Sequence, residues 1–192
     1  MVAIGIDIVD LLQARKESNW QRSGFLEKLF NTEERELIQQ ANDPERMVWL
    51  LWTMKESAYK IYSREFQWHA FAPGQLSCSL LSISSDCATG QVSCRNENYH
   101  TQTILSRDLI HTIAFSDTGT HDNRGIDHDG AACDDSSADK NTGLAKDIQT
   151  AAGMAKKVRV LILKNQDESK SYRKTKPATV SHHGRYLALA YL

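Results

Sequence analysis

The sequence predicts an α+β fold in which helices pack on one side of an antiparallel sheet. Three observations support it: a strand pattern at the N-terminus, one long helix pattern, and a run of short strand-like segments after residue 75. The chain has 192 residues, 41% of them hydrophobic and 24% charged, which is typical of a soluble globular protein with a sizeable core. We expect one domain spanning residues 1–192.

The N-terminal segment 2–8 is predicted to form a strand because isoleucines alternate with smaller or polar residues. This alternation places Asp7 on the face opposite Ile4, Ile6 and Ile8. Strands disfavour aspartate, so Asp7 is a candidate functional residue. The alternative is an edge position that caps the following helix.

A long helix is expected to begin at Asp43 and Pro44, an N-cap acceptor followed by proline at the first helical position, and to run to about Tyr62. Glu56 and Lys60 lie four residues apart on it and therefore share one face, roughly 6 Å apart at Cβ. The ordinary alternative for this spacing is a surface ion pair worth about 0.3–0.5 kcal/mol. The aromatic residues of this helix favour a buried location instead; they are Trp49, Trp52 and Tyr59.

Shorter elements surround the long helix. Asn31 and Glu34 form a candidate capping box. The helical patterns before the long helix cover 10–15, 25–30 and 32–41. The strand-like segments of an antiparallel meander are 75–84, 90–96, 99–106 and 109–116. Beyond them we expect a flexible acidic insert at 118–143, a helix over 144–155, and strands over 158–163, 177–181 and 185–192.

Composition argues against several classes of protein. A net charge of -1 gives no reason to expect nucleic-acid or membrane binding, and no apolar run approaches the roughly 20 residues that span a bilayer. The N-terminus lacks the basic start of a secretory signal. The cysteines show no metal-ligand spacing and suit a reducing, cytoplasmic location; they are Cys78, Cys87, Cys94 and Cys133.

Two motifs, residues 5–7 (GID) and 52–60 (WTMKESAYK), together resemble the signature of the 4'-phosphopantetheinyl transferase superfamily. That signature is G-[IL]-D in a strand followed by W-x-x-K-E-[SA]-x-x-K in a helix. A third motif, Ser181-His182, is similar to the Ser-His or Thr-His of the family. One copy of each, in this order, resembles the short holo-acyl-carrier-protein synthase type. The resemblance implies a half-fold in which an antiparallel sheet packs against a long helix.

The resemblance also implies an activity: transfer of 4'-phosphopantetheine from coenzyme A to a serine of an acyl or peptidyl carrier protein, with release of 3',5'-ADP. In such enzymes the residues matching Asp7 and Glu56 hold Mg²⁺, and the residue matching Glu56 accepts the serine proton. The residue matching Lys60 contacts the transferred phosphate, whereas Lys55 is expected to contact solvent or phosphate. Ser181 and His182 match residues that contact the 3'-phosphate of coenzyme A.

Short members of the family typically assemble as trimers with sites shared between neighbours. We therefore expect a homo-oligomer in which His182 reaches coenzyme A bound mainly by the adjacent subunit. The carrier protein is expected to dock near Arg15, Arg22 and Phe25. Further phosphate contacts are expected from Lys174, Lys176 and Arg185.

Two alternatives stay open at this point. The chain could bind coenzyme A with lost or weak transfer. Outside the family, it could be a cation-binding interaction protein that uses the aspartate-rich segment 118–143.

Overall fold

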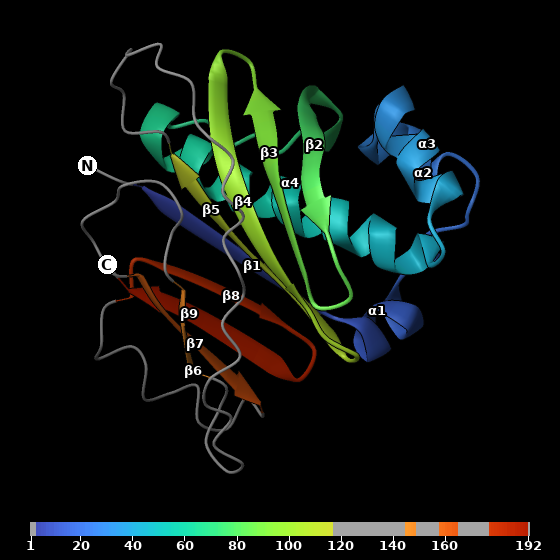
Figure 1. Cartoon of the computed structure of the whole chain (residues 1–192). Helices are drawn as coiled ribbons and strands as arrows, with labels where there is room; N and C mark the ends of the chain where they lie inside the picture. The colour runs from blue at the N-terminus through green and yellow to red at the C-terminus, as the bar shows by residue number, and fades with distance from the viewer. Residues whose placement is uncertain (1–2, 117–144, 149–157, 165–176, 192) are drawn as a thin grey trace.

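The computed structural model describes residues 3–116, 145–148, 158–164 and 177–191. Two antiparallel sheets and four α-helices make up this part of the chain (Figure 1). The long helix α4 (Pro44–Phe66) covers one face of the larger sheet, and the smaller sheet lies beside β1 (Ile4–Asp10). The predicted α+β class, with an antiparallel sheet packed against a long helix, is confirmed.

The larger sheet has the strand order β1-β5-β4-β3-β2. The meander expected from the sequence is present, and its last strand pairs antiparallel with β1, so that Asp7 lies opposite Thr112. The four meander strands are β2 (Leu76–Ile83), β3 (Cys87–Cys94), β4 (Glu97–Leu105) and β5 (Leu109–Ser116). This pairing places the first strand at the edge of the larger sheet, next to the smaller one.

The helices begin where local capping signals predict. Asn31 and Glu34 form the expected capping box, and the Asp43 side chain accepts a hydrogen bond from the Arg46 amide at the start of α4. Helix α4 ends four residues later than expected, at Phe66. The three shorter helices are α1 (Leu11–Glu17), α2 (Phe25–Leu29) and α3 (Thr32–Gln40).

A close contact joins β1 to α4. A Cβ atom on Gly5 would lie 2.0 Å from the Ser57 carbonyl oxygen, so only glycine permits this approach. Gly5 and Asp7 lie on the same face of β1, because alternate residues of a strand share a face. The glycine therefore lets the strand bring Asp7 close to the helix that carries Glu56 and Lys60.

The smaller sheet has the order β6-β7-β9-β8. Its strands are β6 (Ala145–Ile148), β7 (Val158–Lys164), β8 (Thr179–His183) and β9 (Tyr186–Tyr191). The last three confirm the strands expected there. The helix expected over 144–155 is wrong for residues 145–148, which form a strand paired with β7. Residue 144 and the rest of that predicted helix lie outside the described residues, as does the insert expected at 118–143.

Strand β1 is buried on both faces. Ile4, Ile6 and Ile8 pack with apolar residues of the smaller sheet, including Val160 and Ala188. The opposite face of the larger sheet packs on α4 in a second core. Buried charge on β1 is confined to its two aspartates, Asp7 and Asp10.

In the part of the chain that the structure describes, no helix combines the length and the apolar character needed to cross a membrane.

Candidate active site

A pocket of about 930 Å³ opens where β1, α4 and β8 meet the segment between α1 and α2. Apolar side chains form part of its wall; among them are Phe25, Trp49 and Trp52. All five candidate site residues line it: Asp7, Glu56, Lys60, Ser181 and His182. The structure therefore brings together residues from three elements that are up to 175 positions apart in the chain.

Asp7 receives two side-chain hydrogen bonds on one carboxylate oxygen. Lys60 Nζ donates to Oδ1 at 2.9 Å, and Ser181 Oγ donates to the same oxygen at 2.8 Å. Lys60 Nζ also donates to the Ile6 carbonyl at 2.8 Å, which fixes the ammonium group beside β1. No donor among the described residues contacts Asp7 Oδ2, although the side chain is mostly buried. Within the described part of the chain, Oδ2 of Asp7 is therefore available to a ligand.

Glu56 is half-buried, and no hydrogen-bond donor in the described part of the chain contacts its carboxylate. Burial and the nearby Asp7 charge raise the pKa of Glu56 to about 7, although Lys60 acts in the opposite direction. Two carboxylates close enough to perturb one another, each with an oxygen that no donor among the described residues contacts, form a site that a cation would stabilise.

This donor set fits a magnesium ion. Mg²⁺ usually binds one or two carboxylates and completes its coordination with water and substrate phosphates. Among the residues described by the structure, no group of three or more His, Cys, Asp or Glu side chains could hold a metal ion. Asp7 and Glu56 would accordingly need water and phosphate oxygens as additional ligands.

The raised pKa of Glu56 predicts a measurable effect on stability in the absence of metal. An acid whose pKa is higher in the folded state stabilises the fold below its unfolded pKa, and that stabilisation is lost as pH rises toward the folded pKa. With chelator present, Glu56→Gln should match the wild-type Tm near pH 4.5 and exceed it above pH 7. The expected gain is about 1–2 kcal/mol, or about 4 °C, after allowance for solvent screening. A Tm difference that did not vary between pH 4.5 and 8 would contradict the assigned environment.

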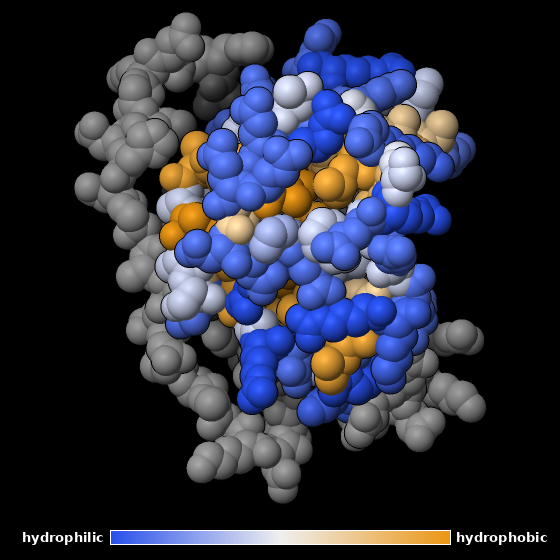
Figure 2. Space-filling model, turned by 90° about the vertical axis from the view of Figure 1, so that its right-hand side faces the viewer, coloured by the Kyte–Doolittle hydropathy of each residue, from blue (hydrophilic) through white to orange (hydrophobic). Residues whose placement is uncertain are grey.

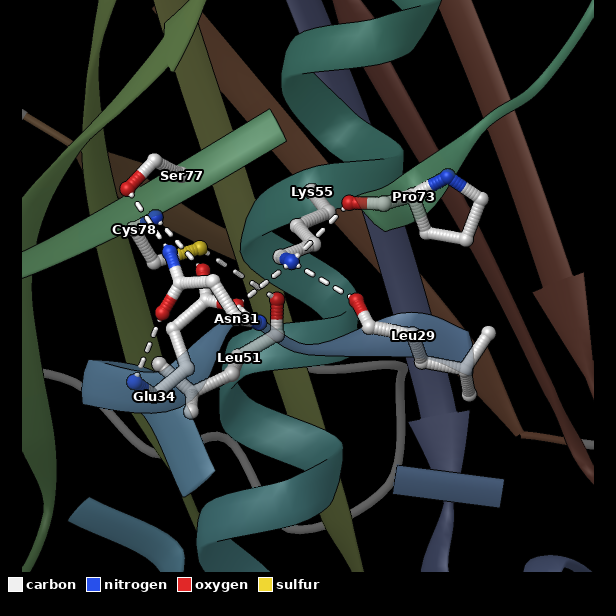
Figure 3. A network of polar contacts seen from close by, with 8 residues as sticks. All are labelled: Leu29, Asn31, Glu34, Leu51, Lys55, Pro73, Ser77 and Cys78. Atoms are coloured by element: carbon white, nitrogen blue, oxygen red, sulfur yellow. Dashed lines mark hydrogen bonds and ion pairs between the residues drawn. The ribbon is translucent and has the colours of Figure 1, made fainter. Parts of the chain in front are cut away.

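Lys55 lies in the protein interior, so the expectation that it contacts solvent or phosphate is wrong. Its Nζ forms an ion pair with Glu34 Oε2 at 2.7 Å, and both side chains are 0% exposed (Figure 3). The same ammonium donates to the carbonyls of Leu29 at 2.8 Å and Pro73 at 3.0 Å. All three hydrogens of Lys55 are used, and the group cannot reach the pocket.

Glu34 connects this ion pair to α3 and β2. Its Oε1 accepts a hydrogen bond from the backbone N–H of Cys78 at 2.7 Å. Its Oε2 accepts one from the backbone N–H of Asn31 at 2.9 Å, as part of the capping box (Figure 3). Helix α4 is thereby tied to the end of α2, the start of α3 and the edge strand β2. The network supports the pocket wall, because Leu29 both accepts from Lys55 and lines the pocket.

The C-terminal motif completes the pocket of its own chain. Ser181 is buried on β8 and contacts Asp7, whereas His182 is exposed and lines the pocket. His182 lines the same pocket as Asp7, because β8 packs directly against β1. The expectation that His182 reaches coenzyme A bound mainly by the adjacent subunit stays a prediction.

The other residues that the sequence analysis expected to contact phosphate or the carrier protein lie in different surroundings. Arg185, expected to contact phosphate, pairs with Asp10 instead, at 2.8 Å. Lys174 and Lys176 lie outside the described residues. Arg22 and Phe25 line the pocket, with the guanidinium 5.3 Å from the ring centroid. Arg15 forms an exposed ion pair with Glu45.

Comparison with known proteins identifies the family. The model of the 4'-phosphopantetheinyl transferase superfamily matches residues 3–114, more than half of the chain. The protein belongs to this superfamily. The matched segment contains Asp7, Glu56 and Lys60 and ends before the smaller sheet, so Ser181 and His182 lie outside it. The family assignment from the two N-terminal motifs is confirmed, and phosphopantetheine transfer is the general reaction of the family.

Two solved structures show distant similarity. The structure titled "Chronobacterium ammoiniagenes apo-ACPS" has a TM-score of 0.45 and 13% identity, over 60% of this chain and 95% of that one. The holo-[acyl-carrier-protein] synthase of Thermotoga maritima has a TM-score of 0.44 and 12% identity, over 60% of this chain and 64% of that one. A search of curated proteins found no match. The family assignment rests on the family model.

Proposed function

We propose that the protein transfers 4'-phosphopantetheine from coenzyme A to a serine of an acyl or peptidyl carrier protein, as enzymes of the holo-acyl-carrier-protein synthase type do. The serine oxygen attacks the β-phosphate, the bond from that phosphorus to the bridging oxygen breaks, and 3',5'-ADP leaves. One observation carries the proposal: Asp7, Glu56 and Lys60 meet in a single pocket inside a segment that matches the family model.

Asp7 and Glu56 would hold Mg²⁺, which neutralises charge on the pyrophosphate when bound. Lys60 is held beside Asp7 and would add a positive charge to the same phosphates. Glu56 would also accept the serine proton. Its pKa of about 7 belongs to the metal-free site, and a bound cation would lower it. These three residues supply charge and a base, which are the main requirements of phosphoryl transfer.

The rest of the pocket suits a long ligand with a charged end. Its volume of about 930 Å³ is near the upper end of ordinary small-molecule sites. The pantetheine arm would lie along the apolar wall formed by Phe25, Trp49 and Trp52. Ser181 and His182 would contact the 3'-phosphate, with Ser181 also bonded to Asp7.

The carrier protein would dock on the side of the molecule that carries α1 and α2. Figure 2 shows this side, and its surface is mostly hydrophilic with hydrophobic residues in small separate patches. Arg22 and Phe25 lie there at the rim of the pocket, and Arg15 lies on α1. Cations beside an aromatic ring suit an acidic carrier, because opposite charges accelerate and orient association.

Mass spectrometry tests the reaction directly. After incubation with coenzyme A and Mg²⁺, an apo carrier protein should gain roughly 340 Da, the mass expected for one transferred phosphopantetheine group in this phosphoryl transfer. A serine-to-alanine carrier is the control and should gain nothing. If the carrier gains no mass while coenzyme A still raises the Tm of the protein, the molecule binds coenzyme A without transferring it.

The binding-only alternative has one observation in its favour. Lys55 and Arg185, two cations expected near phosphates, are committed to ion pairs within the protein. The aspartate-rich cation-binding alternative concerns residues outside the described part of the chain. Calcium binding without coenzyme A binding would support it. Assembly as a trimer and a cytoplasmic location remain predictions from the sequence.

His182→Ala is expected to weaken coenzyme A binding by about tenfold or more while leaving dephospho-coenzyme A nearly unaffected. The reason is that a hydrogen bond to a charged group contributes about 1.5–3 kcal/mol, and only coenzyme A carries the 3'-phosphate. Calorimetric titration of both ligands measures the difference. His69→Ala, a substitution of an exposed histidine outside the pocket, is the control. Equal losses for both ligands would refute the 3'-phosphate assignment.

A further inference from the structure

The turn between β8 and β9 is joined to the end of β1 by an ion pair that the proposed reaction does not use. Arg185 Nε donates to Asp10 Oδ2 at 2.8 Å, and Nη2 donates to Oδ1 at 2.9 Å. The Arg185 amide also donates to Oδ2, at 3.0 Å. The Asp10 side chain is 1% exposed. Such two-pronged pairing fixes orientation as well as distance, which a lysine could not do.

The Asp10 carboxyl is held in its charged form. Burial on its own would raise the pKa of this carboxyl, but hydrogen bonds from Arg185 and from the Gln13 amide outweigh burial and lower the pKa well below its ordinary range. The carboxylate also accepts from the Leu12 amide, as the N-cap of α1. The Asp10–Arg185 pair is therefore a fixed connection between α1, β1 and the hairpin turn.

The neighbouring turn residues fit closely around Asp10. His183 Nδ1 accepts a hydrogen bond from the Asp10 amide at 3.0 Å. Gly184 has a φ of 54°, and a Cβ atom there would lie 2.6 Å from Asp10 Oδ2. His183 at the end of β8 and the two turn residues that follow it thus lie close around one aspartate.

These contacts lie next to the proposed site on both chain segments. Asp10 follows Asp7 by three residues on β1, and the turn directly follows Ser181 and His182 on β8. The hydrogen bond from Ser181 to Asp7, at 2.8 Å, joins β8 to β1 at a second point, three residues before Asp10. We infer that Asp10 and Arg185 are positioning residues that lock the β8–β9 hairpin onto β1 of the same chain, so that each chain carries a complete coenzyme A site. This inference rests on the proposed function.

The positioning role predicts a selective binding defect. Arg185→Met should lower the affinity for coenzyme A by about tenfold or more, with a much smaller loss for dephospho-coenzyme A, because displacement of the turn moves His182. Arg185→Lys keeps the charge but not the two-pronged geometry and should fall between Arg185→Met and the wild type. Calorimetric titration measures both ligands without any carrier protein, and Tm is recorded for each variant.

The control is Arg35→Met, which removes an arginine whose side chain donates a hydrogen bond to Thr32 on α3. It should leave both affinities unchanged. A merely structural role for Arg185 would lower the Tm of Arg185→Met and leave the preference for coenzyme A over dephospho-coenzyme A intact. That result would overturn the positioning role.

Mixing defective chains tests whether one chain holds the whole site. Asp7→Ala and His182→Ala chains, coexpressed in equal amounts, should show no transfer beyond the sum of the two measured separately. If sites were shared between neighbours, about a quarter of them would combine two intact halves, and activity would recover accordingly. Recovery of that size would overturn the single-chain site. If the wild-type protein showed no phosphopantetheine transfer, the proposed function would be refuted instead. The coenzyme A titrations of the Arg185 variants would still decide the role of the Asp10–Arg185 pair.

Discussion

Replacing Glu56 with alanine is expected to slow phosphopantetheine transfer by about 10³-fold, which corresponds to about 4 kcal/mol of transition-state stabilisation. Glu56 would contribute both a negatively charged cation ligand and a proton acceptor, and neither Lys60 nor Ser181 carries a carboxylate that could replace it. Asp7→Ala should cause a loss of similar size, because the cation would lose its ligand on β1. Steady-state rates with an apo carrier protein measure both variants.

Two further variants separate chemistry from folding. Glu65→Ala removes an exposed glutamate nine residues further along α4 and should transfer at nearly the wild-type rate. Glu56→Gln should be inactive although its Tm at pH 8 is at least that of the wild type, since it removes a partly buried charge beside Asp7. Near-normal transfer by Glu56→Ala would contradict the placement of the cation.

Replacing Lys55 with methionine is expected to destabilise the fold by about 3–5 kcal/mol, because it leaves the fully buried Glu34 without its counter-charge. For a protein of this size the Tm should fall by about 10 °C. The Leu29 and Pro73 carbonyls also lose their donor, so the pocket wall around α2 should loosen. Thermal unfolding followed by circular dichroism measures the effect.

A second substitution tests whether the unpaired charge causes this loss. Glu34→Gln in the Lys55→Met background keeps an acceptor for the Cys78 amide and removes the charge, so it should recover part of the lost stability. Lys16→Met, at an exposed lysine on α1, is the matched control and should leave Tm unchanged. A Tm within about 2 °C of wild type for Lys55→Met would show that the buried pair contributes little.

Much of the fold could be predicted from the sequence because its main elements carry local signals. The alternating isoleucines identify β1, and the caps at Asn31 and Asp43 set the starts of α3 and α4 within a residue. Residues 145–148 were mispredicted as helix because their strand exists only through pairing with β7, a contact between segments that local patterns do not report.

The candidate site likewise contains residues that could be identified from the sequence and residues whose roles could not. Asp7, Glu56 and Lys60 could be identified because each lies in a short motif on one element. The ion pairs of Lys55 and Arg185 could not, because their partners Glu34 and Asp10 lie 21 and 175 positions away. The capping pattern of Asn31 and Glu34 was visible in the sequence, but the second use of the Glu34 carboxylate depends on tertiary packing.

Convergence of Asp7 and Glu56 on one cation is most directly tested by anomalous diffraction from crystals grown with coenzyme A and Mn²⁺. A single manganese peak is expected, within roughly 2.2 Å of one oxygen from each carboxylate and bound to pyrophosphate oxygens as well. A metal that contacts neither side chain, or only phosphate and water, would contradict the account.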